Sequence, residues 1–247
     1  MKKQQTHWIF GFHAIESAVE KQPENIIEIM FDASSKNSRG TKLTNNAKNL
    51  GLKLTPASAK KLNQYCKERH HGIIALLRVA KLADENQLKH DIKTLTQPLI
   101  LILDTIEDPR NLGACLRSAD AAGVDCVIFS KHKSSGMTPV TNKTAAGAVE
   151  NLKIYQVTNI VKAIEILKDN GVWIAATDCN AGSKSIYQTD LTGSFAIVLG
   201  NEGKGVRPLV KKHSDYLVHI PMYGAVQSLN VSVATGIALF EARRQRA

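Results

Sequence analysis

Residues 104–123 hold the first group of side chains that could bind an anion. An apolar run ends here, Pro109 stiffens the loop that follows, and Asn111 stands where a helix N-cap is expected. Arg110 and Arg117 are seven residues apart, so both lie on the same polar side of the predicted helix. A guanidinium near a helix N-terminus is well suited to hold a phosphate or an oxyanion. The alternative is structural: an ordinary cap and a solvated arginine.

A glycine-rich turn, residues 195–205 (FAIVLGNEGKG), carries the second group, with Glu202 as its acid. It does not fit the nucleotide P-loop, because Lys204 is followed by glycine rather than Ser or Thr. It does not fit the dinucleotide pattern G-x-G-x-x-G either, because Pro208 occupies the last position. These mismatches argue against a common Rossmann methyltransferase or dehydrogenase. The structural alternative is a tight turn with a solvated carboxylate.

Residues 219–246 form the third group, which contains Ser228 and Asn230. A strand runs into Pro221 and a loop, and we expect a helix to begin near Ser228 as its cap. Many side chains of this helix are small, which suits close packing against another backbone. The basic residues near its end complement the helix dipole and need no nucleic acid to explain them: Arg243, Arg244 and Arg246.

The segments between these groups predict the elements that position them. Apolar runs that read as strands are separated by helical patterns, namely Leu99–Leu103, a helix, Cys126–Phe129, a helix, Trp173–Ala176, Phe195–Leu199, Leu217–Ile220 and a final helix. This order predicts an α/β fold with a parallel sheet covered on both faces. Ligands bind such sheets beyond the carboxyl ends of the strands, and each polar group follows such an end.

Residues 1–80 predict a separate, smaller α/β unit. We expect helices over Phe12–Val19, Thr41–Leu50 and Ser58–Lys67, and strands over Ile26–Phe31, Leu52–Leu54 and Ile73–Val79. Residues 81–97 turn polar and form a linker with one helix, which ends before Pro98. The predicted organisation is therefore a small α/β domain at 1–80, a linker at 81–97 and a larger α/β domain at 98–247.

The charge of the chain favours a polyanionic partner. The net charge is +10, and residues 1–80 contribute +7 of it, with 13 Lys and Arg against 6 Asp and Glu. Such a balance promotes binding to nucleic acid through the phosphates, although basic surfaces also serve solubility. Aromatic residues make up 5% of the chain, which disfavours base stacking as the main mode of binding.

Several other classes of protein are disfavoured. No apolar run approaches the roughly 18 residues that a membrane span needs, and the N-terminus lacks the apolar stretch of a secretion signal. The four cysteines are widely spaced and form no C-x-x-C pair, so we expect reduced thiols, no metal site and a cytoplasmic protein.

Taken together, the three groups resemble the signature motifs of the SpoU/TrmH branch of the SPOUT RNA 2′-O-ribose methyltransferases. The resemblance covers Leu99 to Arg246 and is closest in residues 111–123 (NLGACLRSADAAG) and 228–237 (SLNVSVATGI). The segments GFHA at 11–14 and HGIIA at 71–75 resemble the substrate-binding domain, with a ribosomal-protein-like (L30e-like) fold, of members that modify 23S rRNA.

This resemblance implies a specific enzyme. We expect a homodimer whose C-terminal SPOUT domain contains a trefoil knot and whose activity is S-adenosylmethionine-dependent 2′-O-methylation of a guanosine ribose in 23S rRNA. The resemblance places the cofactor at Gly200, Ile220 and Leu229. The polar site residues of the family fall on Asn111, Arg117, Glu202, Ser228 and Asn230, and no metal is required.

For the mechanism, the family suggests Arg117 as the base, but arginine stays protonated in proteins. Our hypothesis is that Arg117 grips the phosphate next to the target ribose, while Asn111 and Glu202 fix this arginine and the hydroxyl. Three alternatives remain open. They are a tRNA methyltransferase of the same branch, a thiostrepton-resistance type of rRNA methyltransferase, and a non-catalytic ribosome-assembly factor that kept the fold.

Overall fold

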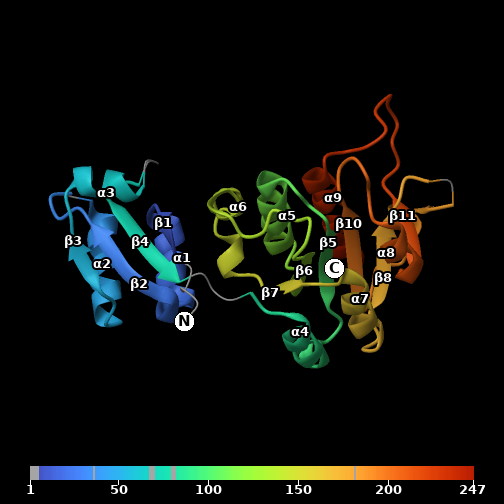
Figure 1. Cartoon of the computed structure of the whole chain (residues 1–247), viewed down its shortest axis with the longest axis horizontal. Coiled ribbons are helices and arrows are strands. Elements are labelled where there is room, and N and C mark those ends of the chain that lie inside the picture. Colours follow the sequence, from blue (N-terminus) through green and yellow to red (C-terminus); the bar gives the residue numbers. More distant parts are fainter. Residues whose placement is uncertain (1–5, 36, 67–69, 79–81, 181) are drawn as a thin grey trace. The chain divides into compact units, whose positions relative to one another are not determined.

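A computed structural model describes residues 6–35, 37–66, 70–78, 82–180 and 182–247. The chain divides into two compact units, Met1–Lys81 and Leu82–Ala247, and Figure 1 shows the elements of each. The predicted helix end at Lys67 and strand end at Val79 lie outside the described residues. Within these ranges, every helix is too short or too polar to cross a bilayer.

The first unit contains a mixed sheet. In the described residues its order is β1-β4-β2-β3, with β1 at Thr6–Phe10, β2 at Ile26–Phe31, β3 at Leu54–Pro56 and β4 at Ile73–Arg78. Strand β4 runs antiparallel to β1 and β2, whereas β2 and β3 are parallel. The helices are α1 (Phe12–Lys21), α2 (Ser38–Asn49) and α3 (Ala59–Tyr65), and η1 (Pro23–Asn25) is a 3₁₀ turn.

Both faces of this sheet are covered, which explains why β4 is apolar throughout. Its alternate residues Ile73 and Ala75 pack toward α1 and α2, and Ile74 packs with Leu62 of α3 on the other face. The predicted strand at Leu52–Leu54 begins two residues later, because Leu52 N–H still bonds to Ala47 of α2 in the turn that ends this helix.

The second unit contains a fully parallel sheet, as predicted. In the described part of the chain its order is β7-β6-β5-β10-β8-β11-β9. The strands are β5 (Leu99–Asp104), β6 (Cys126–Ser130), β7 (Ile154–Val157), β8 (Trp173–Thr177), β9 (Lys184–Ser185), β10 (Phe195–Gly200) and β11 (Tyr216–His219).

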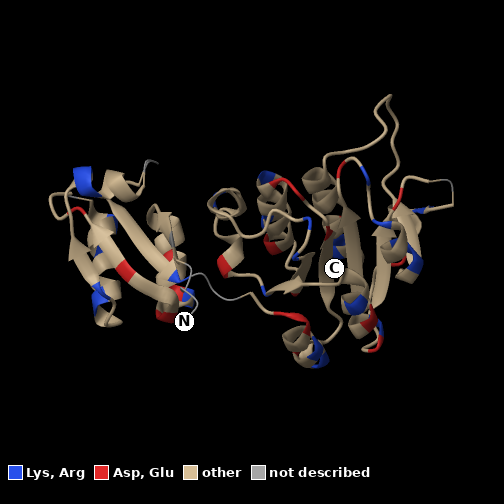
Figure 2. Cartoon of the chain, viewed as in Figure 1, with Lys and Arg blue, Asp and Glu red and all other residues tan. Residues whose placement is uncertain are grey.

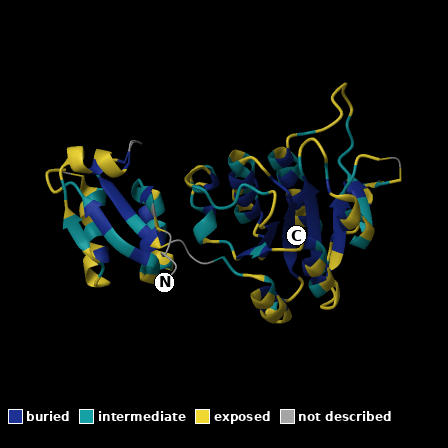
Figure 3. Cartoon of the chain, viewed as in Figure 1, coloured by how far each residue is buried: buried dark blue, intermediate teal, exposed yellow. Residues whose placement is uncertain are grey.

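Helices cover both faces of the parallel sheet. They are α4 (Glu85–Asp91), α5 (Pro109–Ala121), α6 (Pro139–Ala145), α7 (Ile160–Lys168), α8 (Pro208–His213) and α9 (Val231–Gln245), with the 3₁₀ turns η2 (Ile92–Thr94), η3 (Ala148–Glu150) and η4 (Ile186–Gln188). Leu101 of β5 packs toward α5 and α9, whereas Ile100 and Ile102 pack toward α7. The central strands are therefore buried, as Figure 3 shows.

The single helix predicted between β6 and β8 is wrong. The segment instead contains α6, the strand β7 and α7. Strand β7 has four residues, and it is fixed by pairing with β6, where Val127 lies opposite Ile154. A run this short has no periodicity that separates a strand from a helix, so tertiary pairing decided its conformation.

Two predicted helix starts are also wrong. Helix α5 begins at Pro109, and its N-cap is Asp108, whose carboxylate accepts a hydrogen bond from Arg110 N–H at 2.7 Å. Proline is favoured at the first helical position, which places Asn111 inside the first turn rather than at the cap. Helix α9 begins at Val231, and its cap is Asn230 rather than Ser228, because the Asn230 amide oxygen accepts from Ser232 N–H at 2.9 Å.

The helix predicted in the linker, α4, packs on the second unit. The Asp91 carboxylate at its end accepts hydrogen bonds from Gln87 and from the Tyr155 hydroxyl of β7, both at 2.7 Å, and pairs with Lys153 at 2.8 Å. The bonds from Lys153 and Tyr155 hold the pKa of Asp91 far below its usual range. Burial, followed by the bond to Asp91, raises the pKa of Tyr155.

Candidate active site

The three polar groups meet at one edge of the parallel sheet. They follow β5, β10 and β11, and all of these strands run in the same direction. Strands β5 and β10 are direct neighbours, with Asp104 opposite Gly200 at their carboxyl ends. Strand β8 alone separates β10 from β11 in the sheet order of the described residues. The prediction that these segments share one edge is therefore confirmed.

Asn111, Glu202 and Asn230 form a hydrogen-bonded cluster at this edge. The Asn111 amide donates to Glu202 Oε1 at 2.8 Å. The Asn230 amide donates to Asn111 Oδ1 at 3.1 Å and also to Glu202 Oε1. Because Asp108 caps α5, the Asn111 side chain is available for these contacts. Three distant segments thus place one carboxylate between two amides.

The turn that carries Glu202 admits only glycine at its first position. A Cβ on Gly200 would lie 2.2 Å from the carbonyl carbon of Gly205. Asn201 fixes the turn from within, because its Oδ1 accepts from Gly203 N–H at 3.0 Å. The Asn201 amide also donates to the carbonyl of Thr105 at 3.2 Å, which ties this turn to the loop after β5.

An ion pair between a buried carboxylate and a half-exposed guanidinium makes a second tie between the same two loops. The Asp104 carboxylate, at the end of β5, is completely buried. It accepts from the Arg207 backbone N–H at 3.0 Å and from the guanidinium at 2.8 and 2.7 Å. The sequence analysis did not predict this pair. An acid at the end of an apolar strand is a usable signal, because a buried carboxylate is strongly destabilising unless it is paired with a cation.

A cavity of about 440 Å³ opens beside the cluster, between the loops that follow β8, β10 and β11. Its size is within the range of small-molecule and cofactor sites. The three residues predicted to bind a cofactor, Gly200, Ile220 and Leu229, all line it. Glu202 and Ser228 line it as well, so Glu202 belongs to both the cavity and the cluster.

The loop after β8 contributes Asp178 to the cavity, and sequence reasoning missed this residue. Its carboxylate pairs with Lys211 of α8 at 2.8 Å. Burial disfavours ionisation of Asp178, but the hydrogen bonds from Lys211 and Asn180 outweigh it and lower the pKa of the carboxyl below its ordinary value. The rule that ligands bind beyond strand ends could have found it, because Asp178 directly follows β8.

Arg117 is not part of the cluster. It is exposed on α5, six residues after Asn111, which corresponds to about 9 Å along a helix axis. Among the described residues, none forms a hydrogen bond or ion pair with its guanidinium. In this part of the chain, Asn111 and Glu202 therefore do not bond to Arg117 as predicted. They bond instead to each other and to Asn230.

Both units of the chain match known protein families. Residues 98–240 match the SpoU rRNA Methylase family, and residues 8–82 match the domain described as RNA 2′-O ribose methyltransferase substrate binding. The chain belongs to the SpoU rRNA methylase family. The family predicted from the three motifs is confirmed.

Relatives within the SpoU family match along the whole chain. The 23S rRNA (guanosine-2′-O-)-methyltransferase RlmB of Shewanella oneidensis is 46% identical and covers 100% of this chain and 99% of its own. The protein of the same name from Escherichia coli is 42% identical over 96% of this chain and 98% of its own. The AdoMet-bound rRNA methyltransferase from Sinorhizobium meliloti superposes with a TM-score of 0.82 at 24% identity, over 97% of this chain and 87% of that one, which shows a shared fold.

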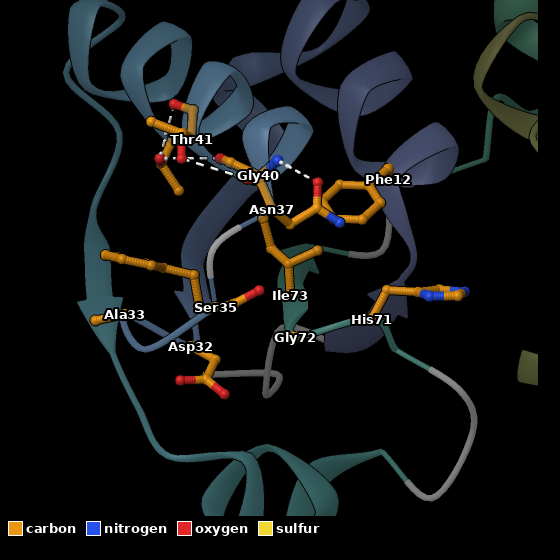
Figure 4. A pocket seen from close by; sticks show the side chains of 12 residues that line it. Phe12, Asp32, Ala33, Ser35, Asn37, Gly40, Thr41, His71, Gly72 and Ile73 are labelled. Atoms are coloured by element: carbon orange, nitrogen blue, oxygen red, sulfur yellow. Dashed lines mark hydrogen bonds between the residues drawn. The ribbon is translucent and has the colours of Figure 1, made fainter.

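The first unit has a cavity of its own, of about 200 Å³. Figure 4 shows the rings of Phe12 and His71 on one side of it and Asp32 and Ser35 on the other. The Arg39 guanidinium lies 5.6 Å from the centre of the Phe12 ring. The cavity therefore combines aromatic and polar surfaces.

Proposed function

We propose that this protein transfers a methyl group from S-adenosylmethionine to the 2′-hydroxyl of a guanosine in 23S rRNA. One observation carries the proposal, namely the cluster of Asn111, Glu202 and Asn230 at the mouth of a cofactor-sized cavity. The chain aligns from end to end with relatives whose names state this reaction, which supports the choice of 23S rRNA over tRNA.

The cavity fits S-adenosylmethionine in size and in chemistry. Gly200 allows the turn to fold closely on the Gly205 backbone, and Ile220 and Leu229 would hold the cofactor through apolar contacts. Asp178 and Ser228 can bond to the hydroxyl and amino groups of the cofactor. When bound, the cofactor supplies a methyl group activated by its sulfonium charge.

Glu202 and the two asparagines would orient the ribose. The Glu202 Oε1 atom accepts from Asn111 and Asn230, which holds the carboxylate in one place, and its second oxygen can accept a hydrogen bond from the 2′-hydroxyl. Positioning of this kind supplies much of the rate enhancement in a displacement reaction.

Arg117 would bind the phosphate beside the target ribose, because it is an exposed guanidinium with no acidic partner among the described residues. A guanidinium holds a phosphate through two parallel hydrogen bonds, which lysine cannot reproduce. We therefore expect Arg117→Lys to lower both turnover and RNA affinity. Near-normal turnover with unchanged RNA affinity would show this role to be wrong.

The first unit would bind the rRNA outside the catalytic site. Its net charge of +7 over residues 1–80 favours phosphate contacts. The cavity beside Phe12 offers a ring face and polar groups that can hold an unpaired base. The name of the matching domain, which refers to substrate binding, supports the same role.

The resemblance to the family extends the proposal to a homodimer, a trefoil knot, an L30e-like first unit and a cytoplasmic location. An apolar stripe on α9 supports the dimer. Val233 is 49% exposed and Phe240, seven residues further along the same face, is 51% exposed. Exposed apolar surface of this kind is typical of contacts between protein copies. Sedimentation of wild type and of Phe240→Glu tests the dimer.

The decisive experiment incubates the protein with labelled S-adenosylmethionine and either 23S rRNA or tRNA. The modified nucleotide is then mapped by mass spectrometry. We expect label in one guanosine ribose of 23S rRNA. Label found in tRNA alone would overturn the proposal, and label in neither RNA would favour a non-catalytic assembly factor.

A further inference from the structure

The loop after β6 carries three consecutive basic residues, Lys131, His132 and Lys133, and all three are exposed. This loop leaves the carboxyl end of β6, which is the direct neighbour of β5 in the sheet. It therefore starts at the same edge as the loop that leads to Asn111.

Hydrogen bonds fix this basic loop to the loop that follows β5. The Ser134 hydroxyl and the Ser135 N–H both donate to the carbonyl of Ile106, at 3.1 and 3.0 Å. The Ser130 hydroxyl closes the turn by donating to the His132 carbonyl at 2.7 Å. Lys133 has a φ of 56°, in the left-handed region that a long side chain rarely adopts. Hydrogen bonds thus fix the backbone of the loop that carries Lys131 and Lys133.

The two lysines also lack acidic partners. Three other lysines of the second unit do pair with aspartates: Lys153 with Asp91, Lys168 with Asp215 and Lys211 with Asp178, at 2.6 to 2.8 Å. Within the described ranges, no residue forms an ion pair or a hydrogen bond with the ammonium group of Lys131 or Lys133. Two positive charges on a loop at the same edge of the sheet therefore remain available to an anion.

We propose that Lys131 and Lys133 bind phosphates of the RNA strand that carries the target ribose. This inference rests on the proposed function, which supplies the polyanion. An ammonium group acts as a point charge toward phosphate, so these contacts add affinity without reading the base. Their anchor on Ile106 couples the bound strand to the loop that precedes Asn111.

The test measures the dissociation constant of a 23S rRNA transcript over a series of salt concentrations. The full-length wild type is compared with the double variant Lys131→Gln/Lys133→Gln. The logarithm of the association constant falls linearly with the logarithm of the salt concentration, and each lost phosphate contact makes this fall less steep by about 0.7 to 0.9. For two lost contacts we therefore expect a slope whose magnitude is smaller by about 1.4 to 1.8. Calorimetric titration with S-adenosylmethionine should give the wild-type affinity for both proteins.

The matched control is Lys89→Gln/Lys93→Gln, which removes the same charge from two exposed side chains of α4 and η2, before β5. Figure 1 shows α4 at the opposite end of the sheet from the loop that follows β11. We expect this control to keep the wild-type slope. An equal loss of slope in both double variants, or an unchanged slope in Lys131→Gln/Lys133→Gln, overturns the inference. Failure of wild type to methylate 23S rRNA would instead refute the proposed function.

Discussion

The two units each hold a cavity lined by polar side chains, but they arrange these side chains in opposite ways. In the second unit, Asn111 bonds to Glu202 and Asn230 across 91 and 119 residues of sequence. In the first unit, the polar side chains of the cavity that form hydrogen bonds do so within their own loop or helix. Asn37 caps α2, and Thr44 donates to the carbonyl of Gly40 four residues before it.

Strand direction explains the difference. In the parallel sheet, every strand delivers its following loop to the same edge, so segments far apart in sequence meet there. In the mixed sheet, β4 runs antiparallel to β2, and the end of β2 at Phe31 lies opposite the start of β4 at Ile73. Figure 2 shows that both units carry lysine and arginine on their helices. Charge alone therefore does not distinguish the two units, whereas the convergence of polar side chains from distant segments does.

The largest effect is expected on turnover, at the cluster of Asn111, Glu202 and Asn230, which the first unit lacks. Glu202→Ala removes the acceptor of both asparagines, and loss of one such preorganised group typically lowers turnover by roughly 10²- to 10³-fold. Turnover is measured with saturating 23S rRNA and cofactor. The control Glu107→Ala removes an exposed acid from the neighbouring loop and should keep wild-type turnover. A variant at Glu202 that stays within about threefold of wild type would mean that the cluster is structural.

The cofactor cavity provides the next test, with two glycines of one turn. A Cβ on Gly200 would collide with the Gly205 backbone, whereas a Cβ on Gly203 would meet Asn201 Oδ1 at 3.8 Å, an ordinary contact. We therefore expect Gly200→Ala to weaken S-adenosylmethionine binding by about 100-fold or more, since a displaced turn loses several contacts at once. Gly203→Ala should bind within a few-fold of wild type. Isothermal titration calorimetry measures the affinity of both variants for S-adenosylmethionine. Equal affinities would mean that this turn does not form part of the cofactor site.

A smaller effect is expected on stability at Asp91. Asp91→Asn leaves the buried Tyr155 hydroxyl with a weaker acceptor, which costs about 1–3 kcal/mol of unfolding free energy. The pKa of Asp91 is lowered in the folded state, so its contribution is full above the ordinary carboxyl pKa and is lost as pH falls. Urea denaturation of both proteins should therefore show a difference that stays constant from pH 7 to about pH 5 and narrows as the pH falls below about 4. A difference that is independent of pH would exclude the ionised carboxylate as its cause.

The smallest effect is expected in the cavity of the first unit. Gly40 lies on α2 with its Cα facing the Phe12 ring, where a Cβ would lie 3.4 Å from that ring. Gly40→Leu fills the cavity while it favours the helix, so the fold should persist. We expect roughly 3- to 10-fold weaker binding of 23S rRNA, with turnover at saturating RNA unchanged.

Asn45→Leu is the control for this cavity, because it lies on α2 outside the cavity lining. Filter binding of the two variants should separate them. Equal RNA affinities would remove the cavity from the binding surface and leave the charge of the unit as its main contribution.

The sequence identified single residues of the candidate site but not the pairs that they form. Glu202 and Asn111 were identified by their place after apolar runs, and the loops that carry them do follow β10 and β5. The role of Asn111 as a cap was wrong, because Asp108 and Pro109 start the helix one turn earlier. The pairs Asp104–Arg207 and Asp178–Lys211 were not predicted, since their members are 103 and 33 residues apart.

The sequence by itself determined most of the strands, including β5, β6, β8, β10 and β11, their parallel direction, the basic first unit and the family. These features depend on hydrophobic periodicity, composition and ordered motifs, which are local properties of the chain. The tertiary structure decided that β10 lies between β5 and β8, and this order brings Glu202 against Asn111. Strand order follows from packing over long separations, which no local pattern encodes. The cluster is therefore a consequence of the sheet as a whole.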